Sequence, residues 1–214
     1  RKALERAQRY LWSGASDARR VRAYLREVRG LTETTIREAG YGYNPRWDRV
    51  EWRDPDTGKQ TSLAPGIIEP WFADGALWAL RVRCRVGNLA AWLGQRDDTW
   101  RGGETLPKYV NLSGSKQTGG IYNGDALTPD TDVLIVEGGF DCMLAQQALG
   151  RSLAVVTFGS ASTMPSARRL TQLRQARRVY LLLDADAAGQ GAQARILDAL
   201  GDRGHKRMQP GTES

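Results

Sequence analysis

Carboxylates follow two short apolar runs in the last third of the sequence. Glu137 directly follows one run, and Asp184 and Asp186 directly follow another. Two acids separated by one residue in extended chain point to the same side. Clustered carboxylates raise one another's pKa unless a cation lies between them, and such hard oxygen ligands select magnesium or manganese over zinc. The spacing therefore predicts a divalent-metal site held by Glu137, Asp184 and Asp186.

The elements that must position these acids are alternating strands and helices. Short apolar runs at 133–136, 153–156 and 179–183 read as strands, and helical segments are expected at 140–149, 165–176 and 187–200, with a fourth strand at 205–208. This alternation is typical of a parallel sheet with right-handed crossovers. Ligands bind at the carboxyl ends of such strands, so the acids converge if the first and third strands are neighbours.

Two alternatives to a metal site apply to the same segments. Asp141 and Asp186 lie at or near expected helix starts, where acids are common for capping reasons alone. Residues 189–194 match the dinucleotide pattern G-x-G-x-x-A. A pyrophosphate bound there faces Asp184 and Asp186 without neutralisation, so the metal interpretation is favoured.

A basic segment lies earlier in the chain. Arg81, Arg83 and Arg85 alternate, which places all three on one face of a strand, and the polar segment 107–116 follows. One interpretation is a solvated strand face. The other is a phosphate-binding wall with arginine forks and Lys108 as a point charge, which nucleotidyl transfer requires beside a metal site.

Composition narrows the classes of protein. The 214 residues are 41% hydrophobic and 26% charged, with 31 Lys and Arg against 24 Asp and Glu, a net charge of +7 that favours polyanionic partners. No apolar run suffices for a membrane-spanning helix. Two distant cysteines and one histidine, His205, exclude a disulfide framework and a four-ligand zinc site. The expected location is a reducing cytoplasm.

The first 125 residues differ in character from the rest. Residues 1–39 show helical periodicity, and residues 1–45 hold ten basic and five acidic side chains. Residues 41–125 contain six tryptophans and many turn signals, which favours twisted antiparallel strands and irregular loops. The tryptophans there are more often core residues than base-stacking platforms.

Together these segments resemble the catalytic core of bacterial DnaG-type DNA primases, especially their phage and plasmid relatives. Residues 137–141 and 184–189 resemble the two signature motifs of the toprim domain, and 158–162 resemble the small-residue loop between them. Residues 107–111 resemble the family's active-site lysine segment, and 24–45 resemble the start of the primase polymerase domain.

The resemblance implies an α+β fold. A basic N-terminal mixed α/β subdomain, residues 1–125, precedes a toprim domain, residues 126–214, which is Rossmann-like with a mostly parallel sheet of about four strands. The family's zinc-binding and C-terminal helicase-binding parts have no counterpart in these residues. Its further acid after the next strand has only Glu213 as a candidate.

The implied activity is that of a DNA primase, a nucleotidyltransferase that makes short RNA primers from ribonucleotides on single-stranded DNA during replication, using Mg²⁺ or Mn²⁺. The expected partners are a template, ribonucleoside triphosphates and a replicative helicase acting through regions outside this chain. The implied site residues are Glu137, Asp184, Asp186 and Lys108 for catalysis, Glu137, Asp141, Asp184 and Asp186 for metal, and Arg81, Arg83, Lys108 and Asn111 for nucleotide or DNA.

Two alternatives stay open. Toprim motifs also occur in nucleases and topoisomerases, which shorten or relax DNA instead of making RNA. The basic charge is equally compatible with a non-catalytic single-stranded DNA-binding module, whose binding is metal-independent and strongly salt-dependent.

Overall fold

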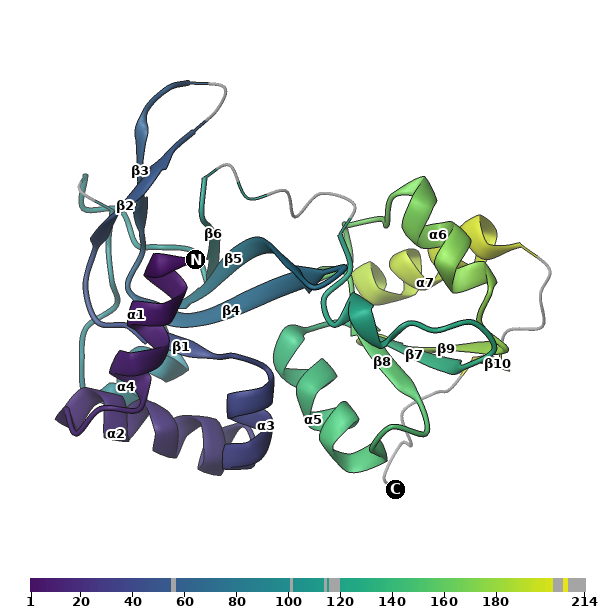
Figure 1. The fold of residues 1–214 in the computed structure, drawn as a ribbon, viewed down its shortest axis with the longest axis horizontal. Coiled ribbons are helices and arrows are strands. Elements are labelled where there is room, and N and C mark those ends of the chain that lie inside the picture. Colours follow the sequence, from purple (N-terminus) through teal and green to yellow (C-terminus); the bar gives the residue numbers. More distant parts are fainter. Residues whose placement is uncertain (55–56, 101, 114, 116–119, 202–205, 208–214) are drawn as a thin grey trace. The chain divides into compact units, whose positions relative to one another are not determined.

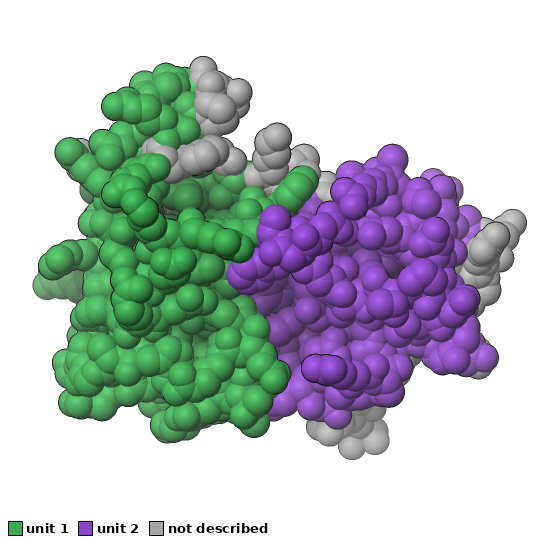
Figure 2. Space-filling model, viewed as in Figure 1, with its two compact units in different colours: residues 1–71, 77–115 green, residues 72–76, 116–214 purple. Residues whose placement is uncertain are grey.

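The computed structural model describes residues 1–54, 57–100, 102–113, 115, 120–201 and 206–207 (Figure 1). The chain forms two compact units, coloured separately in Figure 2. Unit 1 comprises Arg1–Trp71 and Leu77–Ser115, and unit 2 comprises Phe72–Ala76 and Lys116–Ser214. In the part of the chain that the structure describes, no helix is long and apolar enough to cross a membrane.

Unit 1 begins with the helices that the sequence predicts. Buried Leu4, Ala7 and Leu11 form the apolar stripe of the first helix. The Thr32 side chain caps the last of these helices by accepting a hydrogen bond from the Thr35 amide. The elements are α1 (Lys2–Leu11), α2 (Ser16–Ala23), the π-helix η1 (Tyr24–Val28) and α3 (Glu33–Glu38).

Two small sheets follow in unit 1, as the turn signals indicate. A two-stranded antiparallel sheet joins β2 (Asp48–Arg53) and β3 (Gln60–Leu63). The four-stranded sheet has the order β1-β4-β5-β6. Its strands are β1 (Gly42–Asn44), β4 (Gly66–Ala73), β5 (Ala76–Cys84) and β6 (Tyr109–Asn111).

The sequence interpretation of this region is wrong in two respects. Residues expected as strand or loop form the short helix α4 (Asn88–Leu93), which buries Leu89 and Leu93 and ends at Gly94, where φ is 63°. Trp71 is buried, as expected for a core residue, but three other tryptophans are exposed: Trp47, Trp78 and Trp100.

Unit 2 contains the predicted parallel sheet, with the order β10-β9-β7-β8. The strands are β7 (Asp132–Val136), β8 (Ala154–Thr157), β9 (Arg178–Leu182) and β10 (Lys206–Arg207). The helices are the short 3₁₀-helix η2 (Gly124–Ala126), α5 (Gly139–Leu149), α6 (Ala167–Arg174) and α7 (Ala187–Leu200). In Figure 1, α5 lies on one side of the sheet and α6 and α7 on the other. His205 and Met208, expected at the ends of the last strand, lie outside the described residues.

The central strand β7 explains why its sequence is continuously apolar. Val133 and Ile135 are fully buried, and Leu134 and Val136 are nearly so, because helices cover both faces of the sheet. The main core of the unit also takes in Leu173 of α6 and Ile196 of α7.

Unit 2 also includes a segment from much earlier in the chain, the turn between β4 and β5. Asp74 and Gly75 have φ values of 54° and 70°, the conformation of a tight Asp-Gly hairpin turn. Their amides donate to the Asp125 carboxylate over 2.6 and 3.0 Å, and the Asp74 carboxylate pairs with Arg168 at 3.0 Å. The turn is therefore fixed to residues about fifty and about ninety positions away in sequence.

Candidate active site

The acids of unit 2 lie at one edge of its sheet. Strands β7 and β9 are direct neighbours, with Val136 opposite Leu182, so Glu137 and Asp184 leave adjacent strands. The Asp184 amide donates to Glu137 Oε2 over 3.2 Å. The expectation that the first and third strands are neighbours is confirmed, and it brings Glu137 and Asp184 together.

The charges at this edge affect one another. Burial raises the pKa of Glu137 above its ordinary value, and the negative charges of Asp184, Asp186 and Asp141 raise it further. The hydrogen bond from the Asp184 amide opposes this shift. The three aspartates that the sequence proposes are therefore each within electrostatic reach of Glu137.

Two of these acids lie at helix starts, and one of them caps its helix. Asp186 precedes α7, and its Oδ1 accepts a hydrogen bond from the Gly189 amide at 2.8 Å. Asp141 lies in the first turn of α5, and its Oδ2 is 2.6 Å from the position that a Cβ on Gly138 would take. The helix-capping alternative is thus realised for Asp186.

The donor chemistry at this edge fits a hard divalent cation, since every candidate ligand is a carboxylate. A metal site made by Glu137, Asp184 and Asp186 together stays a prediction. Within residues 1–201, apart from the segments left undescribed, no three Asp, Glu, His or Cys side chains lie close enough together to hold a metal ion. The acids line a sheet edge, with Asp186 turned toward the helix amide. Glu213 lies outside the described residues.

Close packing against the Asp184 backbone explains why residue 189 is a glycine, without any role in binding a dinucleotide. A Cβ built on Gly189 would lie 2.0 Å from the Asp184 carbonyl oxygen and 2.9 Å from its carbonyl carbon. Only glycine allows the first turn of α7 to approach the Asp184 backbone this closely. The glycine of the Asp184-x-Asp186 segment therefore serves to place Asp184.

Thr157, which the sequence interpretation did not single out, secures the other side of the edge. Its side chain is fully buried at the end of β8. Thr157 Oγ1 donates to the Glu137 carbonyl at 2.7 Å and accepts from the Gly159 amide at 2.9 Å. It thereby joins the Glu137 backbone to the loop 158–162, and its only sequence signal is a hydroxyl at the end of an apolar run.

Replacing Glu137 by glutamine should stabilise the protein in the absence of divalent cations. The raised pKa of Glu137 means that its ionisation lowers stability as pH rises through the folded-state pKa, and this effect is absent at lower pH. We expect the E137Q melting temperature to exceed that of the wild type at neutral pH, where each 1 kcal/mol corresponds to about 2–4 °C in a chain of this size. The difference should vanish near pH 3, and thermal unfolding at both pH values checks it. A neutral-pH melting temperature at or below that of the wild type would show that the ionised Glu137 side chain does not destabilise the fold.

The basic residues of unit 1 lie on a shared strand face. In the β5–β6 pair, Arg81 is opposite Asn111 and Arg83 is opposite Tyr109. Arg81 Cζ lies 4.0 Å from the centre of the Tyr109 ring, a cation–π contact. Arg81 is only 8% exposed and Arg83 only 3%, so the expectation of an open wall of arginines is wrong. Among the described residues, Arg81 Nη1 and Arg83 Nε form no hydrogen bond.

Arg85 does not belong to this face. It lies beyond the end of β5, where its Nε and Nη2 bind the two Asp98 oxygens at 2.8 and 2.9 Å. Its Nη1 donates to the Tyr43 hydroxyl at 3.3 Å. The alternation predicted three equivalent arginines. In the structure, Arg85 is instead half-buried and links Asp98 to Tyr43.

Lys108 and Asn111 are exposed beside the buried arginines. The Lys108 carbonyl accepts a hydrogen bond from the Cys84 amide, which fixes its backbone, and its Nζ lies 5.9 Å from the Tyr109 ring centre. Lys108 is therefore an exposed cation close to the Tyr109 ring.

Two charged groups near Tyr109 were missed from the sequence. Burial and the fully buried carboxylate of Glu69 raise the pKa of Tyr109, while Arg81, Arg83 and Arg29 lower it. Arg29 also donates to the Tyr24 hydroxyl. Nothing in the sequence around Glu69 or Arg29 indicates that either residue lies near Tyr109.

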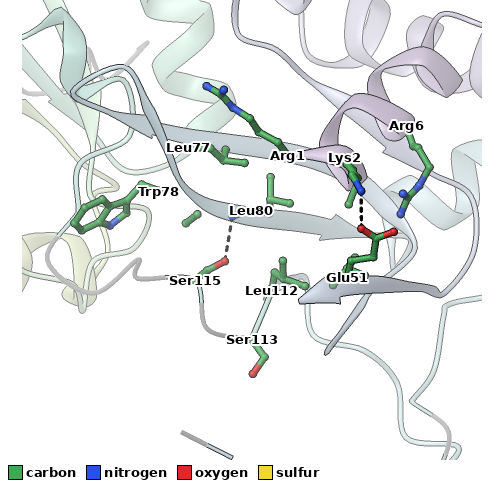
Figure 3. Close-up of a pocket in the computed structure, with 13 residues that line it drawn as sticks. Arg1, Lys2, Arg6, Glu51, Leu77, Trp78, Leu80, Leu112, Ser113 and Ser115 are labelled. Carbon is green, nitrogen blue, oxygen red and sulfur yellow. Dashed lines mark hydrogen bonds and ion pairs between the residues drawn. The ribbon is translucent and has the colours of Figure 1, made fainter. Parts of the chain in front are cut away.

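A cavity of about 420 Å³ also lies in unit 1 (Figure 3). Its walls include Leu77, Leu80 and Leu112, and at its rim Lys2 pairs with Glu51 at 2.8 Å. None of the site residues expected from the sequence lines it. The acidic edge belongs to unit 2 and the arginine face to unit 1.

Comparison with known proteins finds similar sequences for most of the chain. Residues 134–211 match the family model described as Toprim-like. The chain is 30% identical over 203 residues to the DNA primase of Halalkalibacterium halodurans, covering 86% of this chain and 32% of that protein. It therefore spans about a third of the length of the curated relatives that it matches.

Solved structures show the same fold. The DnaG catalytic core matches with a TM-score of 0.68 and 22% identity, covering 99% of this chain and 71% of the other. The DnaG primase catalytic domain bound to single-stranded DNA matches with a TM-score of 0.65 and 22% identity, covering 99% and 72%. The expected α+β fold with a toprim-type parallel sheet is confirmed.

Proposed function

We propose that this DnaG-like chain, which contains a toprim domain, is the catalytic core of a DNA primase. In this role it makes short RNA primers from ribonucleotides on single-stranded DNA, as a nucleotidyltransferase. The observation that carries the proposal is the acidic edge, where Glu137 and Asp184 leave adjacent parallel strands and are linked by a hydrogen bond. The named relatives support the same activity.

The acidic residues are proposed as the ligands of Mg²⁺ or Mn²⁺. Glu137 and Asp184 are the principal candidates, and Asp186 and Asp141, whose charges act on Glu137, are further candidates. A divalent ion bound there supplies positive charge for a triphosphate and its leaving group. Thr157 and Gly189 hold the backbones of the two principal ligands in place.

The basic residues of unit 1 are proposed to bind phosphate. Arg81 and Arg83 are buried, and Arg81 Nη1 and Arg83 Nε form no hydrogen bond with a described residue. Their positive charges attract a phosphate to this face, although these two nitrogens are themselves buried. Exposed Lys108 and Asn111 are proposed to contact nucleotide or template. The proposed partners are single-stranded DNA, ribonucleoside triphosphates and, through regions beyond this chain, a replicative helicase.

A single assay separates this function from its alternatives. The protein is incubated with labelled ribonucleotides, Mg²⁺ or Mn²⁺ and either single-stranded DNA or a supercoiled plasmid, and the RNA and DNA are both examined. Template-dependent RNA supports a primase. Shortened or relaxed DNA identifies a nuclease or topoisomerase, and intact DNA bound without new RNA identifies a binding module.

Replacing Lys108 by alanine should lower nucleotide incorporation far more than template affinity. A positioned cation stabilises charge that develops at the reacting phosphate, and losing one such group costs about 10²–10³-fold in turnover. Arg9 is the control, since it is also exposed but lies on α1. Arg9→Ala should weaken binding modestly and leave turnover unchanged. Equal small effects of both substitutions on turnover and affinity would show that Lys108 is only surface charge.

A further inference from the structure

Two tryptophans from distant segments contact each other on the surface of unit 1. Trp47 lies between β1 and β2, and Trp100 lies in the turn closed by the Thr99–Thr105 bridge. Their ring centres are 5.5 Å apart at an interplanar angle of 35°. They are 36% and 38% exposed, so the pair presents aromatic surface to solvent instead of filling the core.

Contacts of the Arg85 side chain link the two segments that carry this aromatic pair. Asp98, two residues before Trp100, forms a bidentate ion pair with Arg85 that is mostly buried. Tyr43, four residues before Trp47, accepts a hydrogen bond from the same guanidinium. The half-buried Arg85 therefore links the two segments that carry the exposed rings, which limits the entropy lost when a ligand binds them.

We propose that Trp47 and Trp100 form a stacking platform for the unpaired bases of a single-stranded nucleic acid. The inference rests on the proposed function, because it names where the template contacts unit 1. Every base has a π-face, and a base stacked on an aromatic side chain gains affinity whatever its sequence. Arg46 and Arg49, which flank Trp47 in sequence, are exposed and supply cations for the backbone.

The surroundings of the pair favour a nucleic acid over a protein partner. A protein-docking surface requires a contiguous apolar patch. Outside the pair, the exposed large apolar side chains of the described chain are Val28, Trp78, Leu144 and Leu149. Val28 and Trp78 lie on other elements of unit 1, and the two leucines lie in unit 2. Two rings flanked by arginines suit a base and its phosphates, and the net charge of +7 agrees with this.

The test compares two labelled oligonucleotides of about 12 nucleotides, the upper range of a single-domain site. One is oligothymidylate and the other has the same backbone without bases. Their affinities are measured by fluorescence anisotropy for the wild type and for Trp47→Ala, Trp100→Ala and Trp100→Tyr. Trp78→Ala is the matched control, because Trp78 is 42% exposed in the same unit but lies away from the pair in β5.

We expect each alanine variant of the pair to bind oligothymidylate about tenfold more weakly, since one stacked base contributes that much. Binding of the base-free oligomer and the salt dependence of affinity should not change. Trp100→Tyr should recover most of the affinity, and Trp78→Ala should match the wild type. Unchanged oligothymidylate affinity in both alanine variants, or an equal loss for the two oligomers, overturns the platform. A wild type that binds neither oligomer instead overturns the proposed function itself.

Discussion

Replacing Asp184 by asparagine should abolish primer synthesis while leaving the fold intact. The Asp184 side chain is exposed, and the contact that links it to Glu137 is made by its backbone amide, which asparagine retains. What disappears is one negative charge at the acidic edge. Without it the proposed divalent cation loses a principal ligand, and we expect incorporation to fall by about 10²–10³-fold or more.

Asp198 provides the matched control for this experiment. It is an exposed aspartate in α7, so Asp198→Asn removes the same charge from the same region without touching the sheet edge. Template-dependent incorporation and thermal melting are measured for both variants. If Asp184→Asn supports normal primer synthesis, the acidic edge is not the catalytic centre.

Replacing Gly189 by alanine should damage both stability and activity. The added Cβ would lie 2.0 Å from the Asp184 carbonyl oxygen, and the obstructing atoms are backbone, which cannot rotate away. Helix α7 and the Asp184 segment must therefore separate, and we expect a loss of about 2–3 kcal/mol in the free energy of unfolding. Because Asp184 moves with its backbone, incorporation should fall as well.

Gly191 in the same helix provides the comparison. A Cβ there would lie 3.4 Å from Arg195 Nη1, the end of a flexible side chain. Gly191→Ala should therefore be neutral or stabilise the helix by up to about 1 kcal/mol. Chemical denaturation of both variants checks the pair. Equal stabilities would mean that the close approach of α7 to Asp184 is not required.

The architecture of unit 2 could be predicted because its physical signals are local. Apolar runs bounded by turn residues predicted strands, and carboxylates directly after two of them predicted an acidic edge. The predicted strands are confirmed, because a strand buried on both faces must be apolar. The acids lie at one edge because parallel neighbouring strands end at the same edge of the sheet. The position of Asp184 could also be predicted, since it depends only on strand order.

The details that failed depend on tertiary packing. Alternation placed Arg81, Arg83 and Arg85 on one strand face, but it contains no information on burial or on where the strand ends. The pairing of Trp47 with Trp100 requires knowing how two distant loops fold against Arg85. Asp186 caps α7 through its side chain, a local role that the sequence also offered, and its part in metal binding stays a prediction.

The Asp74-Gly75 turn has a consequence for the order in which the chain folds during synthesis. Unit 2 is discontinuous in sequence, because residues 72–76 belong to it while 77–115 belong to unit 1. When the ribosome releases this turn, its partners Asp125 and Arg168 have not yet been made. The turn must wait until they emerge, so the two units cannot mature strictly one after the other. For the same reason, a fragment that begins at Lys116 contains Asp125 but lacks the amides of Asp74 and Gly75, which donate hydrogen bonds to its carboxylate.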